Sequence, residues 1–487
     1  MAKPSASTFA CHSLRPLDMI AIDSMISQSY SFIEKFLEHL WSSGCLPPNL
    51  MVRVTTKELN YTESNYKKPH CVFIPKDARD VSFAVQIFKG NNTKFAVRGG
   101  DHMAIPGCNN IDAPGVMLST TNLNTLALND DKTMVSVGPG NRWANVYAYL
   151  QPHDLVAVGG RVGEIGVPGL LLGGGISFYS NQYGFASDNV VKYECVLADG
   201  SIIEATANNT YSDLFWALKA GGNSFCIATR FDLPTYKSSQ VWVGTAQYSF
   251  NQSSAFLDGV YNFAKHGALD AKAAITPIVS VAPTEGKIRY LLTKFYDSET
   301  DSPTVWRNFR TPHMAPDSDS YKLQPLSTFI NAYDGPVTGA LRRAVSVVSS
   351  IVDREALNII HTTLIDMAIK RLTVKKDAVA GVAIQPLSAE FIRQGYLKGG
   401  NPQGIDLSRA QYLMTFIADF TAKVNDLLAR AGLGAQYLYL NDAGEGQKVF
   451  ESYGKENLER LKSVREKYDP LKVYSELMPG GWKVSNA

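Results

Sequence analysis

The stretch Val97-Arg98-Gly99-Gly100-Asp101-His102 is the most informative for the fold, because it follows directly on an apolar run, Lys94 to Val97, that predicts a β-strand. The glycines let backbone N–H groups approach a phosphate closely, and Arg98 adds a fixed positive charge with a forked set of donors. The pattern predicts a nucleotide-phosphate cradle with the His102 imidazole beside it. An ordinary turn with a surface histidine would give the same pattern, so the downstream sequence has to decide.

A second glycine-dense segment runs from Gly159 to Ser177 and contains Gly173-Gly174-Gly175. It matches neither the dinucleotide fingerprint Gly-x-Gly-x-x-Gly nor the phosphate loop Gly-x-x-x-x-Gly-Lys-Ser/Thr. Nicotinamide dinucleotides and nucleoside triphosphates are therefore disfavoured as ligands. We expect the two glycine-dense loops to lie on either side of one cofactor of another kind.

The two loops are followed in order by Glu194 to Gly200, Asp213 to Gly222, Tyr439-Leu440-Asn441-Asp442 and Lys467-Tyr468-Asp469-Pro470. With this series the chain resembles the FAD-linked oxidases of the vanillyl-alcohol oxidase superfamily, and most of all the fungal members of its berberine-bridge-enzyme-like branch. The resemblance implies FAD as cofactor and an α+β fold. That fold is a PCMH-type two-part FAD-binding domain with an inserted antiparallel-sheet substrate-binding cap domain.

The same resemblance implies a covalent flavin. His102 matches the histidine that bonds to a methyl carbon of the flavin ring, whereas Val162 stands where some relatives add a second bond from a cysteine. A single link through His102 is therefore expected. The residues that the resemblance places at the cofactor are Arg98, Gly99, Gly100, Asp101, His102, Val162, Gly163, Gly166, Val167, Gly173, Gly174, Gly175, Asn189, Ile227 and Asn441.

Asp101, Pro168 and Cys226 depart from the family, whose members usually carry glycine at these positions. Asp101 also puts a negative charge beside the expected pyrophosphate, which is unfavourable unless the carboxylate faces solvent or pairs with a neighbour such as Arg98. One interpretation is that all three side chains face outward and are tolerated. The other is that binding of FAD is weakened or lost.

Composition narrows the class of ligand. The 487 residues include 47 basic and 45 acidic ones, a net charge of +2, so neither nucleic acid nor an anionic membrane is expected as a partner. Six scattered cysteines without a Cys-x-x-Cys pair suggest no metal site. No signal peptide or membrane span is evident, so we expect a cytoplasmic enzyme acting on a small molecule, with a secreted or vesicular location as the open alternative.

Four segments are predicted along the chain: a helical segment at 1–69 that packs on the FAD domain, the FAD-binding domain at 70–236, the cap at 237–436, and a C-terminal segment at 437–487 that completes the FAD domain. Periodicity predicts helices at Phe32 to Trp41, Arg142 to Tyr149, Gly339 to Val352 and Ala410 to Ala431. It predicts cap strands at Gln240 to Phe250, Ala274 to Ala282 and Lys287 to Phe295.

Tyr439 and Asn441 are the candidate catalytic residues, because a β-strand would put both side chains on one face and the family presents that strand to flavin and substrate. Tyr439 could act as a base if positive charge or hydrogen bonds stabilised its anion. A packed tyrosine with a satisfied hydroxyl is the equally weighted alternative. Asn441 is expected to orient flavin or substrate.

Three functions remain open from the sequence. The leading one is an FAD-dependent oxidase that passes hydride from a secondary metabolite to flavin, with dioxygen as acceptor and oxidative cyclisation as a further outcome. The second is a redox-neutral cyclase or isomerase on the same scaffold with weakened or lost FAD. The third is a metabolite-binding protein on an inactive scaffold.

Overall fold

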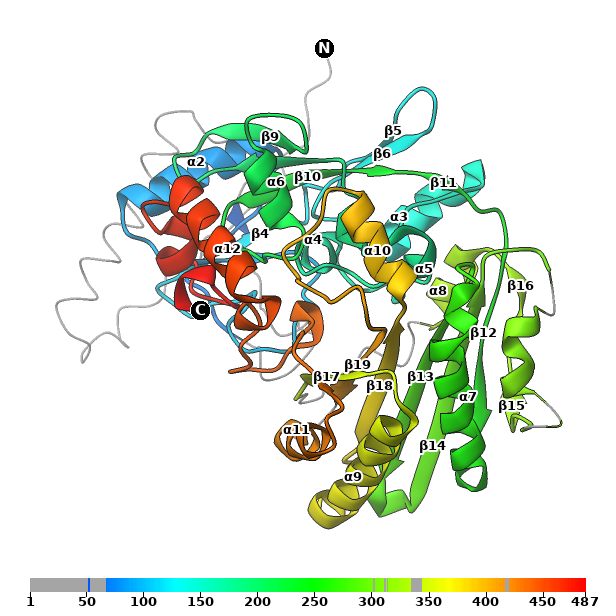
Figure 1. Cartoon of the computed structure of the whole chain (residues 1–487). Helices are drawn as coiled ribbons and strands as arrows, with labels where there is room; N and C mark the ends of the chain where they lie inside the picture. The colour runs from blue at the N-terminus through cyan, green and yellow to red at the C-terminus, as the bar shows by residue number, and fades with distance from the viewer. Residues whose placement is uncertain are drawn as a thin grey trace.

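A computed structural model describes residues 67–300, 303–310, 312, 314–333, 344–416 and 420–487, together with the backbone of strand β1 (Met51–Val52). The helix predicted at Phe32 to Trp41 lies outside the described residues. Figure 1 shows the described chain as two bodies, one built on two small sheets and one on a single large sheet.

The first small sheet is the one that leads into the histidine loop. Its order is β1-β2-β4-β3, with β2 (Cys71–Phe73), β3 (Phe95–Arg98) and β4 (Val116–Ser119) parallel. Helix α2 (Ala78–Gly90) connects β2 to β3 and begins at Asp77, whose carboxylate accepts hydrogen bonds from the N–H groups of Arg79 and Asp80. The short β3 ends at Arg98, so the glycine turn emerges at the carboxyl edge of this sheet.

The second small sheet is antiparallel and carries the second glycine loop between its strands. Its order is β5-β6-β10-β8-β9, with β5 (Leu126–Leu128), β6 (Met134–Val137), β8 (Lys192–Val196), β9 (Ile202–Thr206) and β10 (Ile227–Pro234). Helices α3 (Trp143–Leu150), α4 (Val167–Leu172), α5 (Ser180–Tyr183) and α6 (Ser212–Leu218) lie in its connections. The predicted helix at Arg142 to Tyr149 is confirmed by α3. A two-stranded ribbon pairs β7 (Leu155–Val156) with β11 (Tyr236–Lys237).

The large sheet is antiparallel throughout and forms the cap. Its order is β15-β12-β14-β13-β18-β19-β17-β20, with β16 also paired to β12. The strands are β12 (Val241–Tyr248), β13 (Ala273–Ala282), β14 (Lys287–Tyr296), β15 (Ser318–Asp319), β16 (Lys322–Gln324), β17 (Ser346–Ile351), β18 (Ala380–Leu387), β19 (Gln411–Phe416) and β20 (Gly434–Ala435). The three predicted cap strands are confirmed by β12, β13 and β14.

Helices α7 (Ser253–Lys265), α9 (Arg354–Leu372) and α11 (Thr421–Arg430) cover one face of the cap sheet (Figure 1). A separate apolar core fills that interface, and every residue of it comes from positions 246–428. The opposite face of the sheet turns toward the two small sheets, with α8 (Leu326–Tyr333) and α10 (Ala389–Leu397) at its margins. Alternate residues of each cap strand therefore point either into the helical layer or toward the glycine loops.

The C-terminal segment returns to the first body. Helix α12 (Lys455–Tyr468) packs on α6, and the Tyr468 hydroxyl donates to the Asp213 carboxylate at 2.7 Å. Figure 1 shows this red segment against the blue α2 and the green α6. Its apolar side chains, from Tyr437 to Val484, belong to the same core as the two small sheets.

Two predicted helices are partly wrong. Of Gly339 to Val352, the part at Ser346–Ile351 is strand β17, and of Ala410 to Ala431, the part at Gln411–Phe416 is strand β19. These two segments pair with each other and lie inside the sheet, so burial against neighbouring strands overrides their helical periodicity. The second half of the latter prediction is confirmed by α11.

Candidate functional site

The two glycine loops cross with their backbones in contact. A Cβ built on Gly100 would lie 2.3 Å from both the N and Cα atoms of Gly166, and a Cβ on Gly166 would lie 2.4 Å from the Gly100 nitrogen. Neither position can hold a side chain unless the backbone moves. Pro168, in the first turn of α4, fills the adjacent space, since its Cγ would be 2.6 Å from a Cβ on Gly99.

Asp101 is buried at this crossing with only 7% of its surface exposed. Its Oδ1 lies 3.8 Å from Nε of Arg98, which is equally buried, and accepts a 2.6 Å hydrogen bond from the Asn109 amide. Burial raises the pKa of Asp101 to about 7, against the opposing effect of Arg98, of Arg142 and of the Asn109 hydrogen bond. Of the two arrangements expected for Asp101, its carboxylate therefore pairs with Arg98 and does not face solvent.

The interpretation that the three unusual residues face outward is wrong for Asp101 and Cys226, whereas Pro168 is half-buried. Asp101 is buried, Pro168 packs on Gly99, and Cys226 is buried in the main core beside Cys195. Asp101 and Cys226 thus fill space inside the protein, and Pro168 fills the space beside Gly99 while part of its ring stays exposed. His102 follows Asp101 and is half-buried in the same turn.

The second loop supplies the predicted Val162, Gly163, Gly166 and Val167. Gly163 and Val167 are buried, Val162 is half-buried, and Val167 begins α4. The Trp143 and Ala144 N–H groups of α3 donate to the carbonyls of Ile165 and Gly163, so the loop is fixed to the start of a helix.

The Gly173-Gly174-Gly175 turn brings the candidate catalytic pair into the same region. Gly174 and Gly175 have φ values of +104° and +84°, which favour glycine, and a Cβ on Gly173 would lie 2.0 Å from Oδ1 of Asn441. The Asn441 amide donates to the Leu170 carbonyl at 3.1 Å and to the Tyr439 hydroxyl oxygen at 3.0 Å. The Ile176 N–H donates to the same hydroxyl oxygen at 3.1 Å.

The prediction that a β-strand presents Tyr439 and Asn441 is wrong. After the two residues of β20, residues 436–439 belong to no sheet, and Leu440–Asp442 is a turn of 3-10 helix. Side chains satisfy this backbone instead, because the Leu438 N–H donates to Ser452 Oγ and Ser349 Oγ donates to the Tyr437 carbonyl. The tight turn still brings Tyr439 and Asn441 into contact.

Burial raises the pKa of Tyr439 well above that of a free phenol, and the nearby Asp442 raises it further. The Asn441 amide, Arg161 and the Ile176 N–H act in the opposite direction but do not compensate. Tyr439 therefore holds its proton at neutral pH, and its two N–H donors make it a fixed hydrogen-bonding group.

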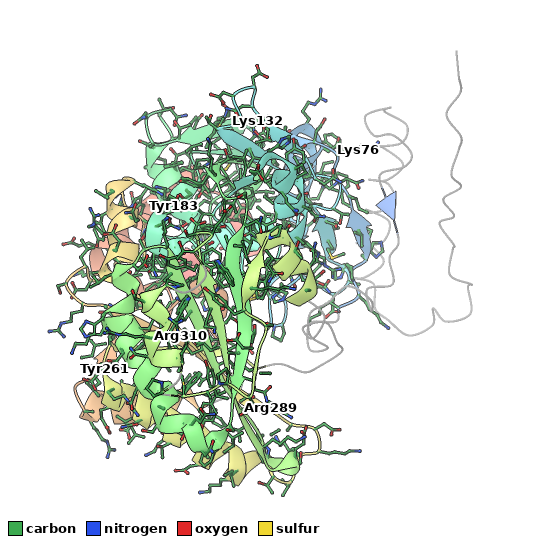
Figure 2. The ribbon with its side chains drawn as sticks, turned by 90° about the vertical axis from the view of Figure 1, so that its right-hand side faces the viewer. Lys76, Lys132, Tyr183, Tyr261, Arg289 and Arg310 are labelled. Carbon is green, nitrogen blue, oxygen red and sulfur yellow. The ribbon has the colours of Figure 1, made fainter. Side chains whose placement is uncertain are left out.

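Asn189 and Ile227 are positioned by other elements than the crossing of Gly100 and Gly166. Asn189 donates to the carbonyls of Tyr183 and Phe185, and its oxygen accepts from the Tyr236 hydroxyl and from Nζ of Lys398, at 2.6 Å. Figure 2 shows Tyr183 between the body that carries Lys76 and Lys132 and the cap that carries Arg310. Asn189 thus joins the 183–189 loop to the cap, while Ile227 begins β10 in the core.

Sequence reasoning missed the polar residues that the cap and the second loop contribute. Nη1 of Arg161 donates to Thr276 Oγ1 at 2.8 Å and to Oε1 of Gln385. Thr415 Oγ1 donates to the Asp442 carboxylate at 2.7 Å. Gln403 is fully buried beside Gly174, with its amide nitrogen bonded to the Tyr437 hydroxyl.

A separate cavity of about 540 Å³ lies between the 105–108 loop, residues 445–451 and the C-terminal residues 479–487. It is lined by Lys483, whose Nζ donates to the Asn223 side chain at 2.8 Å and whose pKa burial lowers to about 7. In the described ranges no cluster of three or more His, Cys, Asp or Glu side chains could hold a metal ion. No helix in that same part of the chain combines the length and apolarity needed to cross a bilayer.

The chain is similar to known proteins over both bodies. Residues 69–206 match the FAD binding domain family. The FAD-dependent monooxygenase prx3 of Penicillium roqueforti is 31% identical over 448 residues, covering 86% of this chain and 87% of that protein. The bifunctional solanapyrone synthase of Alternaria solani is 30% identical over 437 residues, covering 86% and 82%.

Solved structures share the fold at low identity. Berberine bridge enzyme from Eschscholzia californica superposes with a TM-score of 0.70 at 16% identity, covering 91% of this chain and 99% of that one. The 6-hydroxy-D-nicotine oxidase of Arthrobacter nicotinovorans also gives 0.70, at 18% identity, covering 86% and 93%. The α+β, PCMH-type architecture with an antiparallel cap sheet, expected from the sequence, is thereby confirmed.

Proposed function

We propose that this chain, which belongs to the FAD-dependent oxidoreductases of the berberine-bridge-enzyme-like family, is an oxidase of a small secondary metabolite. The two relatives compared by sequence are fungal proteins. The electrons would pass from the substrate to FAD and then to dioxygen. The observation that carries the proposal is the contact of Asn441 with Gly173, where the glycine turn, the Tyr439 hydroxyl and Gln403 of the cap lie together.

The residues present suit FAD. At the crossing of Gly100 and Gly166, and at Gly174 and Gly175 with their positive φ values, no side chain stands between the backbone and a ligand, and we propose these glycines as the cradle for FAD. Gln403 Oε1 is a buried acceptor that has no hydrogen-bond partner in the described part of the chain, and it lies at this cradle. An imide N–H such as the flavin ring carries would satisfy it.

When bound, FAD supplies the hydride acceptor that no side chain can provide. We assign the pyrophosphate to the Arg98–Gly100 turn and the covalent link to His102. Val162 cannot form a second link, because it has no nucleophilic atom. Tyr439 and Asn441 would orient flavin and substrate by hydrogen bonds, and the cap would exclude water from the reacting atoms.

The first test is an absorption spectrum before and after acid precipitation of the wild-type protein and of His102→Ala. We expect flavin bands that stay with the wild-type pellet and that pass to the supernatant for His102→Ala. A colourless protein that does not take up added FAD would refute the proposal that it is an FAD-dependent oxidase.

A second test needs no known substrate. The bound flavin is photoreduced without oxygen and then mixed with dioxygen in a stopped-flow cell. Rapid reoxidation with release of hydrogen peroxide in an amount equal to the flavin is expected for an oxidase. Reoxidation no faster than that of free reduced flavin would point to another electron acceptor.

The second candidate, a redox-neutral cyclase, is supported by the carboxylate of Asp101 at the phosphate turn. The name of the Alternaria solani relative, a bifunctional synthase, is compatible with cyclisation either after oxidation or in its place. An oxidase coupled to cyclisation needs FAD for turnover, whereas a pure cyclase would turn over equally well after FAD has been removed from His102→Ala.

A further inference from the structure

Arg161 links the second glycine loop to the cap sheet. It precedes Val162, and its Nη1 donates to both Thr276 on β13 and Gln385 on β18. Ile275 and Val279 of β13 belong to the core under the cap helices, so Thr276 between them faces the opposite way, toward the loop. The guanidinium is thus held between the loop and the cap sheet.

Asp442 is attached to the same face of the cap from the other side. Its carboxylate accepts from Thr415 on β19, two residues along the strand from Leu413. The register places Gln385 opposite Leu413 and Ala383 opposite Thr415, so Gln385 and Thr415 are diagonal neighbours. Such neighbours lie roughly 7–8 Å apart, which places the anchors of Arg161 and Asp442 within the length of one small substrate.

The Asp442 carboxylate and the Arg161 guanidinium have complementary chemistry, since the first can accept a proton and the second can donate hydrogen bonds. Burial raises the pKa of the Asp442 carboxyl, while the Thr415 hydrogen bond and the charge of Arg161 lower it again. Arg161 also acts on Tyr439, and Asp442 acts on Tyr437 and Tyr439, so all these groups share one electrostatic environment. A carboxylate made more basic by burial is suited to accept a proton, and a guanidinium is suited to hold an oxygen that becomes negative.

We propose that Asp442 accepts the proton of a substrate hydroxyl and that Arg161 hydrogen-bonds the oxygen left behind, so that the substrate is an alcohol, enol or phenol. This inference rests on the proposed function, since FAD is the oxidant. The substrate O–H would give its proton to Asp442, and bound FAD would accept a hydride from a C–H bond, so that the C–O bond would become C=O. In an alcohol this C–H lies on the carbon that bears the oxygen, and in an enol or phenol it lies on a carbon conjugated with that oxygen. Asp442 then releases its proton to water.

The probe for this pair is 4-nitrophenol, which is yellow as the phenolate and colourless as the phenol. It is titrated into the holoprotein at a pH where the free probe is mostly phenol, and the difference spectrum is recorded against the flavin background. We expect the bound probe to show the phenolate band, because Asp442 takes its proton and Arg161 holds the oxygen. Binding as the colourless phenol, or no binding, would overturn the proposal.

The variants assign the effect to the two residues. In Arg161→Gln we expect loss of the band and binding weaker by at least about tenfold, and in Asp442→Asn we expect the probe to bind as the phenol. Arg430→Gln and Asp426→Asn, at an exposed ion pair on α11, are matched controls that keep the band. A band that survives in both site variants would contradict the proposal.

Melting temperature and FAD content are measured on every sample. If Arg161→Gln does not fold, Arg161→Lys keeps the charge but not the forked donors and serves in its place, with an intermediate affinity expected. Absence of FAD from the wild type would refute the proposed function, whereas the colour of the probe reports on Arg161 and Asp442 without any reduction of flavin. The two failures are therefore distinguishable.

Discussion

Gly100 and Gly166 touch through their backbones, although 66 positions separate them along the chain, and this contact holds the two glycine loops at a fixed distance. Both loops leave less than a methyl group of space at the contact. Any side chain at either position must push the loops apart, and with them the positions of His102 and of α4.

Gly100→Ala is therefore expected to lower the free energy of unfolding by about 1–3 kcal/mol and to weaken FAD uptake, because the new methyl group meets rigid backbone. Gly169→Ala is the matched control, since a Cβ at this position in α4 meets nothing within 4 Å. That variant should be neutral or slightly stabilising. Urea unfolding and FAD titration of both variants measure the difference, and equal stability of the two would disprove the steric role of the contact.

Asp101 should make FAD affinity depend on pH. With a pKa raised to about 7, its carboxyl is mostly neutral at pH 6 and mostly charged at pH 8, where it repels a pyrophosphate and competes for Arg98. In a His102→Ala background, which leaves FAD exchangeable, we expect the dissociation constant to rise by about threefold to tenfold from pH 6 to pH 8. Asp101→Asn in that background should abolish this rise, and a wild-type Asp101 that shows no rise would refute the assignment of the phosphate turn.

The same shift predicts the stability of the apoprotein. Because the folded pKa of Asp101 is raised above its unfolded value near 4, its favourable contribution is complete below about pH 4 and is lost as the pH rises to about 7. The stability of Asp101→Asn relative to the wild type should therefore increase between pH 5 and pH 7.5 and then level off. Urea unfolding at a series of pH values checks this, and a difference that is constant with pH would contradict it.

Much of the first body could be predicted from the sequence, because short apolar runs bounded by glycine define β3, α3 and the loops between them. The cap strands β12 to β14 alternate clearly and were equally predictable. The strands β17 and β19 were not, since each lies inside the sheet and both of its faces are covered, which removes the alternation that marks a half-exposed strand.

The candidate site was only partly predictable for a related reason. Glycine turns carry a local signal in the sequence, whereas Arg161, Asp442 and Gln403 act through partners that are distant along the chain. Arg161 bonds to Thr276 at a separation of 115 residues, Gln403 to Tyr437 at 34, and Asp442 to Thr415 at 27. The polar residues Thr276 and Gln385 at positions of cap strands that face inward were the one available signal. A polar side chain on a buried strand face indicates a partner or ligand.

Tyr439→Phe should cost stability and disturb the flavin environment without moving a pH optimum. Its hydroxyl accepts from the Ile176 N–H and the Asn441 amide, so its removal leaves two buried donors unsatisfied, at about 1–3 kcal/mol each. The raised pKa of Tyr439 means that no titration of this phenol should appear below pH 9 in the flavin spectrum. Tyr396→Phe is the control and should cost about 1 kcal/mol or less, because this exposed tyrosine loses one hydrogen bond to the Ile405 carbonyl and leaves no buried donor unsatisfied. A flavin signal that titrates near pH 7 and vanishes in Tyr439→Phe would restore Tyr439 as the base.

Lys398 should hold the 183–189 loop against the cap in a way that depends on pH. Its Nζ donates to the Tyr183 carbonyl at 2.7 Å and to the Asn189 side chain at 2.6 Å, and burial lowers its pKa to about 8. Above that pH the amine is neutral and both hydrogen bonds lose their charge assistance, so the amides of residues 183–189 should exchange their hydrogens faster at pH 9 than the intrinsic rate increase explains.

Lys398→Met should show this faster exchange already at pH 7, after the same correction for intrinsic rate. Lys375→Met, at an exposed lysine of the cap, should leave exchange in 183–189 unchanged at both pH values. Hydrogen exchange followed by mass spectrometry resolves this segment from its neighbours. Equal protection in Lys398→Met and Lys375→Met would show that Lys398 does not hold the loop and that the other hydrogen bonds of the loop suffice, such as those from Asn189 and from the Ala186 N–H to the Gly175 carbonyl.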